Sequence, residues 1–256
     1  MKKKEQKQFI SSIEERQISE EQDLVFDFLR RYASQYHHED FISSDPVQFP
    51  HRYHSKADIE ISGFLTAFLS FGARPQILKA AERLDVLMER KPLQYVLSEK
   101  WKADFCGEES FYRTVSKNKM AQMFYWLHTI YSKYVSMEDA LLREALGTPM
   151  QRLCRLLGVS DKAPQKKLNM FLRWMIRRNS KVDFGIWTHF SPCELIVPLD
   201  THVSEMAFRL GLTKSQSYTL NNAKAITRAL AEVFPEDPCL GDFALFGYGI
   251  NRKVNV

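Results

Sequence analysis

The segment VPLDTHVSEMAFRLGL, residues 197–212, carries the pattern that decides the fold class of this chain. Apolar side chains recur there at the spacing of one helical face, at Val203, Met206, Ala207 and Leu210. Asp200 therefore lies at or near the N-terminus of a helix, where aspartate is a common capping residue. A cap is the simple interpretation of Asp200, and a chemical role is the alternative.

A second predicted helix, residues 165–178, lies upstream and has two different faces. Its buried stripe is expected to consist of Leu168, Phe171, Leu172 and Met175. The opposite face is expected to carry Lys166, Arg173 and Arg177, with Met170 and Trp174 beside it.

Basic residues are concentrated in and around this second helix. Residues 162–181 contain seven of them and no acidic residue. A local basic face of this kind is typical of phosphate binding. The predicted DNA-binding residues are Lys162, Arg173, Arg177, Arg178 and Lys181. The alternative is that these charges are merely solvated and that Trp174 packs against another helix.

PLDTHV, followed by a helix that ends in RLGL, resembles a segment of the helix-hairpin-helix DNA glycosylase superfamily, which includes endonuclease III and 8-oxoguanine glycosylase. In that superfamily the aspartate at this position is catalytic, and Asp200 matches it. The resemblance implies an all-α fold of two helical lobes with the site in the cleft between them. The chain also resembles a family of uncharacterised bacterial proteins that share KLNMFLRWM, PLDTHV and DFALFGYGI.

Within the superfamily the archaeal 8-oxoguanine glycosylase branch is most similar, because its lysine lies in a Q-K-T stretch that opens a helix well before a P-V-D motif. Here QKKLNMFL opens such a helix, and Lys166 lies 34 residues before Asp200. The resemblance implies that Lys166 is the nucleophile, with Lys167 as the alternate if the register differs by one residue. A flipped base would also need an aromatic partner, and Trp174 and Trp187 are the candidates.

Two features of the superfamily are absent from the sequence: the L-P-G-V-G hairpin signature and the four-cysteine iron–sulfur loop. The cysteines lie far apart and form no C-x-x-C pair. The pair His51 and His54 falls in segment 41–56, which is predicted to be irregular and would not fix the geometry of a metal site. We therefore expect no iron–sulfur cluster, no other cofactor and no metal.

The organisation of the chain is that of an ordinary globular protein, with 45% hydrophobic and 26% charged residues. We expect residues 1–20 to form a flexible basic tail and residues 21–256 to form a single helical unit. Its central lobe is expected over about 57–160, and its second lobe over about 21–56 plus 161–256. No apolar run reaches the roughly 18 residues that span a bilayer, and the basic N-terminus lacks an apolar signal core, so a cytoplasmic protein is expected.

These residues favour a DNA base-excision repair glycosylase, with or without AP lyase activity, that acts on a damaged base flipped out of double-stranded DNA. The pairing of Lys166 with Asp200 favours this enzyme. The missing hairpin glycines favour the alternative, a non-catalytic nucleic-acid-binding protein on the same helical scaffold. An unrelated helical interaction or structural protein is a third interpretation. No membrane partner and no obligate protein partner are expected.

Overall fold

The protein is mostly helical, as its periodicity predicts. The structure, a computed structural model, describes the backbone of residues 20–254 and the side chains of residues 20–249, so nearly all of the predicted tail lies outside the described residues. The helices are residues 20–36, α2 (Asp40–Ser44), η1 (Pro46–Gln48), η2 (Pro50–Arg52), α3 (Lys56–Leu69), α4 (Arg74–Leu87), α5 (Pro92–Ser98), α6 (Trp101–Asp104), α7 (Lys117–Tyr131), α8 (Met137–Arg143), α9 (Pro149–Leu157), α10 (Lys166–Ile176), η3 (Pro192–Glu194), α11 (Thr201–Arg209), α12 (Leu220–Val233) and α13 (Leu240–Val254).

A short antiparallel hairpin, β1 (Ser110–Tyr112) and β2 (Val115–Ser116), interrupts this helical order and was not predicted from the sequence. Arg113 lies in the turn between the strands with a φ of 52°, in the left-handed region. Two strands of three and two residues are too short to show an alternation of apolar and polar side chains, so the periodicity gave no signal for them.

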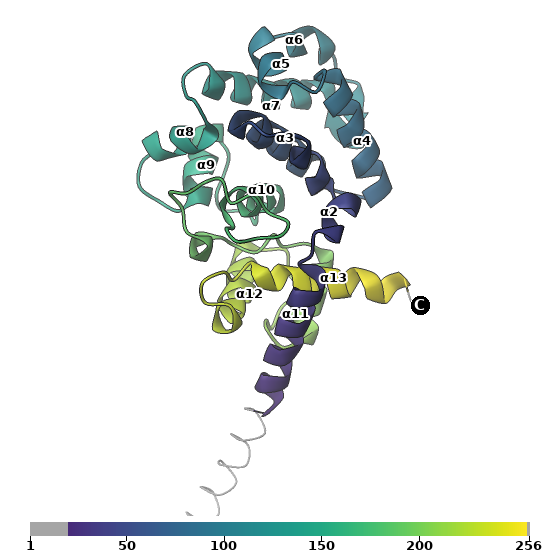
Figure 1. The fold of residues 1–256 in the computed structure, drawn as a ribbon, viewed down its shortest axis with the longest axis vertical. Helices are drawn as coiled ribbons and strands as arrows, with labels where there is room; N and C mark the ends of the chain where they lie inside the picture. The colour runs from purple at the N-terminus through teal and green to yellow at the C-terminus, as the bar shows by residue number, and fades with distance from the viewer. Residues whose placement is uncertain (1–19, 255–256) are drawn as a thin grey trace, which may run out of the picture.

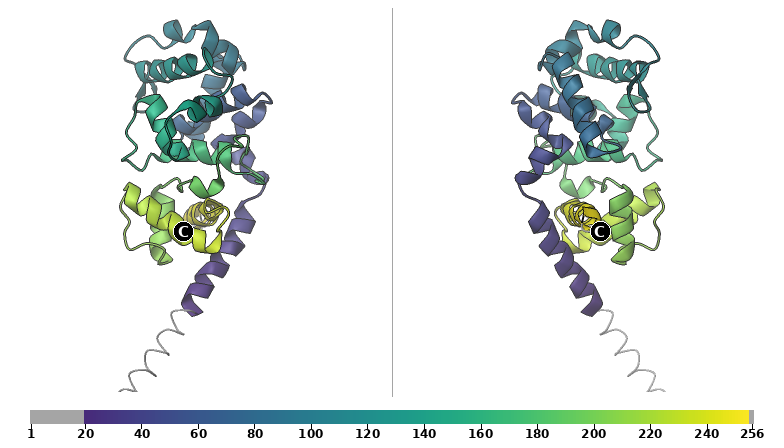
Figure 2. Two further views of the ribbon diagram at one scale, coloured as in Figure 1. Left: turned by 90° about the vertical axis from the view of Figure 1, so that its left-hand side faces the viewer. Right: turned by 90° about the vertical axis from the view of Figure 1, so that its right-hand side faces the viewer.

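The buried hydrophobic side chains form two clusters. The larger cluster includes α3 and α10, which pack against each other, together with residues from the helices between them. The smaller cluster joins helix 20–36 to α11, α12 and α13. Figures 1 and 2 show the same grouping, with α3 to α10 in the upper part of the view and α11, α12, α13 and the purple first helix in the lower part.

The buried carboxylate of Glu60 holds the interior of the larger cluster together. It lies on α3, where residues 59–67 and Leu69 are all buried. Three groups donate hydrogen bonds to it: the Tyr131 hydroxyl at 2.6 Å, the Met137 backbone N–H at 2.8 Å and the Trp187 indole N–H at 2.6 Å. Burial raises the pKa of Glu60. The loop that follows α10 is therefore anchored to α3 through Trp187.

Segment 41–56 is more regular than predicted. It contains most of α2 and both 3-10 helices, each of which has a proline, Pro46 or Pro50, at its first position. The His51 Nε2 atom lies 2.8 Å from the carbonyl oxygen of Val182. The prediction of an irregular segment is therefore wrong, and His51 is a packing residue that connects this segment to the loop after α10.

Candidate functional site

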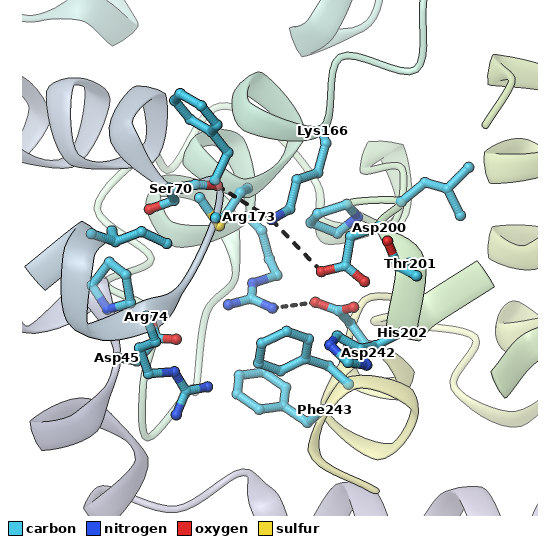
Figure 3. A pocket seen from close by; sticks show the side chains of 18 of the residues that line it. Asp45, Ser70, Arg74, Lys166, Arg173, Asp200, Thr201, His202, Asp242 and Phe243 are labelled. Carbon is cyan, nitrogen blue, oxygen red and sulfur yellow. Dashed lines mark hydrogen bonds and ion pairs between the residues drawn. The ribbon is translucent and has the colours of Figure 1, made fainter. Parts of the chain in front are cut away.

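A pocket of about 870 Å³ contains the predicted catalytic residues, and we call it the Asp200 pocket. Its walls are residues 70–74 between α3 and α4, the side of α10 that begins at Lys166, residues 198–202 at the start of α11, and α13 around Phe243. Lining residues thus come from both hydrophobic clusters. Figure 3 shows charged side chains of α10, α11 and α13 directed toward one another inside this pocket.

Asp200 is the N-cap of α11, as the sequence predicts. One carboxylate oxygen, Oδ1, accepts a hydrogen bond of 3.0 Å from the Val203 backbone N–H. The other oxygen, Oδ2, lies 3.7 Å from the Lys166 Nζ atom. The Asp200 side chain is 18% exposed. A single carboxylate therefore caps a helix and faces a lysine in the pocket at the same time.

Lys166 is the first residue of α10 and reaches Asp200 across the pocket (Figure 3). The preceding residue, Gln165, has a φ of 43°, and this left-handed conformation turns the chain into the helix. The Lys166 ammonium also donates to the carbonyl oxygen of Ser70 at 3.4 Å. These two contacts hold the Nζ atom in place, and because the side chain is 31% exposed, it remains accessible.

Lys167, the alternate candidate for the nucleophile, points elsewhere. Its Nζ atom lies 4.1 Å from the ring centroids of both Phe68 and Phe71, and it does not line the Asp200 pocket. Burial, together with the nearby charges of Lys119 and Lys166, lowers the pKa of Lys167 to about 8. The structure therefore places Lys166, and not Lys167, opposite Asp200.

Arg173 and Arg177 are buried, so the prediction that they contact DNA phosphates is wrong. Arg177 is 1% exposed and pairs with Asp183 and with Asp237, whose nearest oxygen lies 2.8 Å away. Arg173 is 6% exposed and pairs with Asp242 and, at 3.5 Å, with Asp183. All three carboxylates lie C-terminal to the basic segment 162–181, so the sequence of that segment does not reveal them.

Trp174 and Trp187 are fully buried at 0% exposure, so the prediction that either stacks on a flipped base is wrong. Trp174 lies within the larger cluster. The backbone N–H of Phe184 donates to the Trp174 carbonyl oxygen at 2.8 Å, which folds the following loop back onto α10. Trp174 packs inside the fold, which agrees with the alternative given for it in the sequence analysis.

The remaining predicted DNA-binding residues, Lys162, Arg178 and Lys181, are exposed. Arg178 donates from Nη2 to the carbonyl oxygens of Thr188 at 2.6 Å and Phe190 at 2.8 Å. Its guanidinium is therefore partly engaged in holding the loop after α10. Lys162 and Lys181 remain the members of the set that are available to an external phosphate.

Two buried carboxyl groups of the Asp200 pocket were missed by the sequence analysis. Asp242 pairs with Arg173, but its Oδ1 atom is buried without a hydrogen-bond partner. Burial, opposed by Arg173 and reinforced by Asp200, raises the pKa of Asp242 to about 6. Asp45 also lines the pocket, and burial raises its pKa too. Asp242 belongs to the DFALFGYGI motif, but nothing in that motif indicates burial of its one acidic residue.

The described residues contain no group of three or more His, Cys, Asp or Glu side chains that could hold a metal ion. Within the same residues, every helix is too short or too polar to cross a membrane.

These observations define a class of protein: a helical protein in which a lysine and a carboxylate face each other in a pocket. Residues 45–251 match the model of a family described as "Protein of unknown function (DUF2400)". This match covers more than half of the chain, so the protein belongs to that family. The comparison with curated proteins and the comparison with solved structures found no match.

The buried position of Arg177 leads to a first prediction. Replacing Arg177 with Met should destabilise the protein by about 3–5 kcal/mol, because Asp183 and Asp237 lose their buried cationic partner. Lys181→Met is the matched control, because this exposed lysine should contribute less than about 0.5 kcal/mol. Urea denaturation measures both variants. Equal stability of the Arg177→Met variant and the wild type would contradict the ion-pair assignment.

The lowered pKa of Lys167 leads to a second prediction. Above a pH of about 8 the folded state releases the Lys167 proton, whereas the unfolded state keeps it up to the usual value of 10.5. The free energy of unfolding should therefore rise with pH across this interval. Lys167→Met should remove that contribution, seen as a difference between the wild-type and variant urea midpoints that changes between pH 8 and pH 10. A constant difference would show that Lys167 titrates normally.

Proposed function

We propose that the protein is a DNA glycosylase with AP lyase activity, in which Lys166 is the nucleophile and Asp200 the assisting carboxylate. The observation that carries this proposal is the distance of 3.7 Å between Lys166 Nζ and Asp200 Oδ2 in a pocket large enough for a nucleotide. The two residues were singled out by their resemblance to the glycosylase motifs, and they face each other in the fold. A structure with both lysines turned away from Asp200 would have opposed the proposal.

The proposed reaction uses the two residues in different ways. The unprotonated Lys166 amine attacks C1′ of the deoxyribose and forms a new C–N bond. The bond between C1′ and the base breaks, its electron pair leaves with the base, and the base takes up the proton that the attacking amine releases through Asp200. Asp200 stabilises the positive charge that develops on the sugar and accepts a proton from the attacking amine. Opening of the sugar ring then gives an imine between Lys166 and C1′.

The rest of the Asp200 pocket suits a flipped base better than the buried tryptophans do. The partly buried Phe246 of α13 and the 53% exposed Tyr218 supply aromatic surface along its walls. We propose that these groups, in place of Trp174 and Trp187, contact the base.

The wider features of the proposal follow from the same resemblance. We propose a two-lobed glycosylase-like arrangement in which the two hydrophobic clusters are the lobes and the Asp200 pocket is the cleft between them. These bounds differ from the expected ones, because α10 and the loop after it, expected in the second lobe with residues 161–256, belong to the larger cluster with α3. The substrate is damaged double-stranded DNA, the protein acts in the cytoplasm, and neither cofactor nor metal takes part in the reaction. Lys162 and Lys181 are the exposed cations that we assign to the DNA backbone.

A non-catalytic nucleic-acid-binding protein is the second candidate. The observation that favours it is the hydrogen bond from Val203 to Asp200, because a helix cap alone is sufficient reason for an aspartate at this position. The two functions differ in whether the Lys166 amine forms a covalent bond with DNA. The two experiments below therefore separate them.

The nucleophile can be trapped directly. Borohydride should reduce the imine between Lys166 and an abasic sugar to a stable protein–DNA crosslink, visible by gel electrophoresis. Lys166→Gln removes the amine and should abolish the crosslink. Lys167→Gln should still form it, because the Lys167 side chain lies against Phe68 and Phe71 and faces away from Asp200. Loss of the crosslink in Lys167→Gln alone would transfer the role to Lys167. Absence of both crosslink and excision in the wild type would favour the binding protein.

The two roles of Asp200 can be separated by one substitution. Asn caps a helix as well as Asp does, so Asp200→Asn should preserve stability within about 1 kcal/mol. It cannot carry the negative charge beside a cationic sugar, so excision should fall by roughly a hundredfold or more. Single-turnover excision assays and thermal denaturation measure the two effects. A folded Asp200→Asn protein with wild-type excision would reduce Asp200 to a cap.

A further inference from the structure

A second pocket, of about 370 Å³, adjoins the Asp200 pocket and shares Ser70, Phe71 and Lys166 with it. We call it the Trp126 pocket. Its other walls come from α3, from Trp126 of α7, from the end of α9 and from the start of α10. Phe68, Phe71 and Trp126 are only partly buried, so three aromatic rings border a space that no side chain of the described residues fills.

The polar part of this pocket is cationic. Lys166 and Lys167 both line it, and the charge of Lys119, in the first turn of α7, contributes to the lowered pKa of Lys167. The Arg113 guanidinium lies 5.7 Å from the ring centroid of Phe71. None of the described residues that line the pocket is acidic. The like charges therefore repel one another, and an anion placed among them would relieve this repulsion.

We propose that the Trp126 pocket binds a nucleotide, with the base between Trp126, Phe68 and Phe71 and the phosphate against Lys119 and Lys167. A purely apolar ligand would leave the lysines without a counter-charge, and a small inorganic anion would leave the aromatic walls uncovered. A nucleotide satisfies both, because every base has a flat face for stacking and every phosphate accepts hydrogen bonds from ammonium groups. The nucleotide is either a free mononucleotide or one unit of a DNA strand.

This site goes beyond the catalytic role proposed for Lys166. The Trp126 pocket needs neither Asp200 nor Asp242, and it lies against α7 and α9, which contribute no residue to the Asp200 pocket. Its occupant therefore binds whether or not the protein removes bases from DNA. Trp126 and Lys119 do not line the Asp200 pocket, so dAMP binding that depends on them tests the Trp126 pocket, whereas borohydride trapping and base excision test the glycosylase proposal. Failure of one proposal is therefore distinguishable from failure of the other.

The test uses dAMP as the probe and tryptophan fluorescence as the signal. Trp101, Trp174 and Trp187 are buried at 4%, 0% and 0% exposure, so stacking of a base can quench only Trp126 directly. We expect dAMP to quench the full-length protein in a saturable manner, and inorganic phosphate at the same concentration to leave the fluorescence unchanged. A short single-stranded oligonucleotide that binds more tightly than dAMP assigns the site to a DNA strand, and weaker binding assigns it to a free nucleotide.

Variants identify which of the two pockets binds dAMP. Lys119→Gln, at an exposed position, should weaken dAMP binding by about tenfold, because one charge-assisted contact is lost. Lys133→Gln is the matched control on an exposed lysine that follows α7, and its affinity should equal that of the wild type. Trp126→Leu should abolish both the quenching and the heat of binding measured by calorimetry. Tyr218→Ala removes an aromatic ring from the Asp200 pocket and should change neither.

Three results would overturn the proposal. The first is a lack of dAMP binding at millimolar concentration. The second is equal affinity in Lys119→Gln and Lys133→Gln, which would remove the lysines from the site. The third is loss of binding in Tyr218→Ala with binding retained in Trp126→Leu, which would place the nucleotide in the Asp200 pocket.

Discussion

The buried ion pairs of Arg173 and Arg177 are the constraint on which the candidate site depends. Two guanidinium groups on α10 lie in the interior, where a charge without partners would be strongly unfavourable. Asp183, on the loop after α10, contacts both of them, and Asp237 and Asp242 contact one each. The pairs join the larger hydrophobic cluster to α13. Because they fix α10 against α13, they also fix Lys166 at the start of α10 relative to the pocket.

The burial of Arg173 and Arg177 could not be predicted from the basic segment 162–181, because the segment shows only their neighbours in sequence. Asp183 lies just beyond the window, and Asp237 and Asp242 lie more than fifty residues further along the chain. Helical geometry correctly separated the Leu168 face from the arginine face, but Arg173 and Arg177 are buried as well, and only the start of their face, at Lys166, stays accessible. An amphipathic pattern identifies which side chains share a face, and it does not reveal whether the polar face meets solvent or carboxylates of another element.

Other features were predictable because they depend on local chemistry. The place of Asp200 at the start of a helix follows from the apolar spacing of residues 203–210, and the structure has it as the N-cap of α11. The resemblance to the glycosylase motifs identified Lys166 and Asp200 as a pair, and in the fold Lys166 Nζ lies 3.7 Å from Asp200 Oδ2. Asp242 and the Trp126 pocket were not predictable, because their properties arise from burial and from contacts between distant segments.

The hydrogen bond from the Val203 N–H to Asp200 has a consequence for conformational entropy. A carboxylate on a free rotamer must be ordered whenever a ligand arrives, and the loss of rotamer freedom weakens binding. In this fold one oxygen of Asp200 is already held by the first turn of α11, so the other oxygen keeps its direction toward Lys166. The Asp200 side chain is thus ordered during folding, and binding of a cationic group in the pocket costs no further rotamer entropy at this residue.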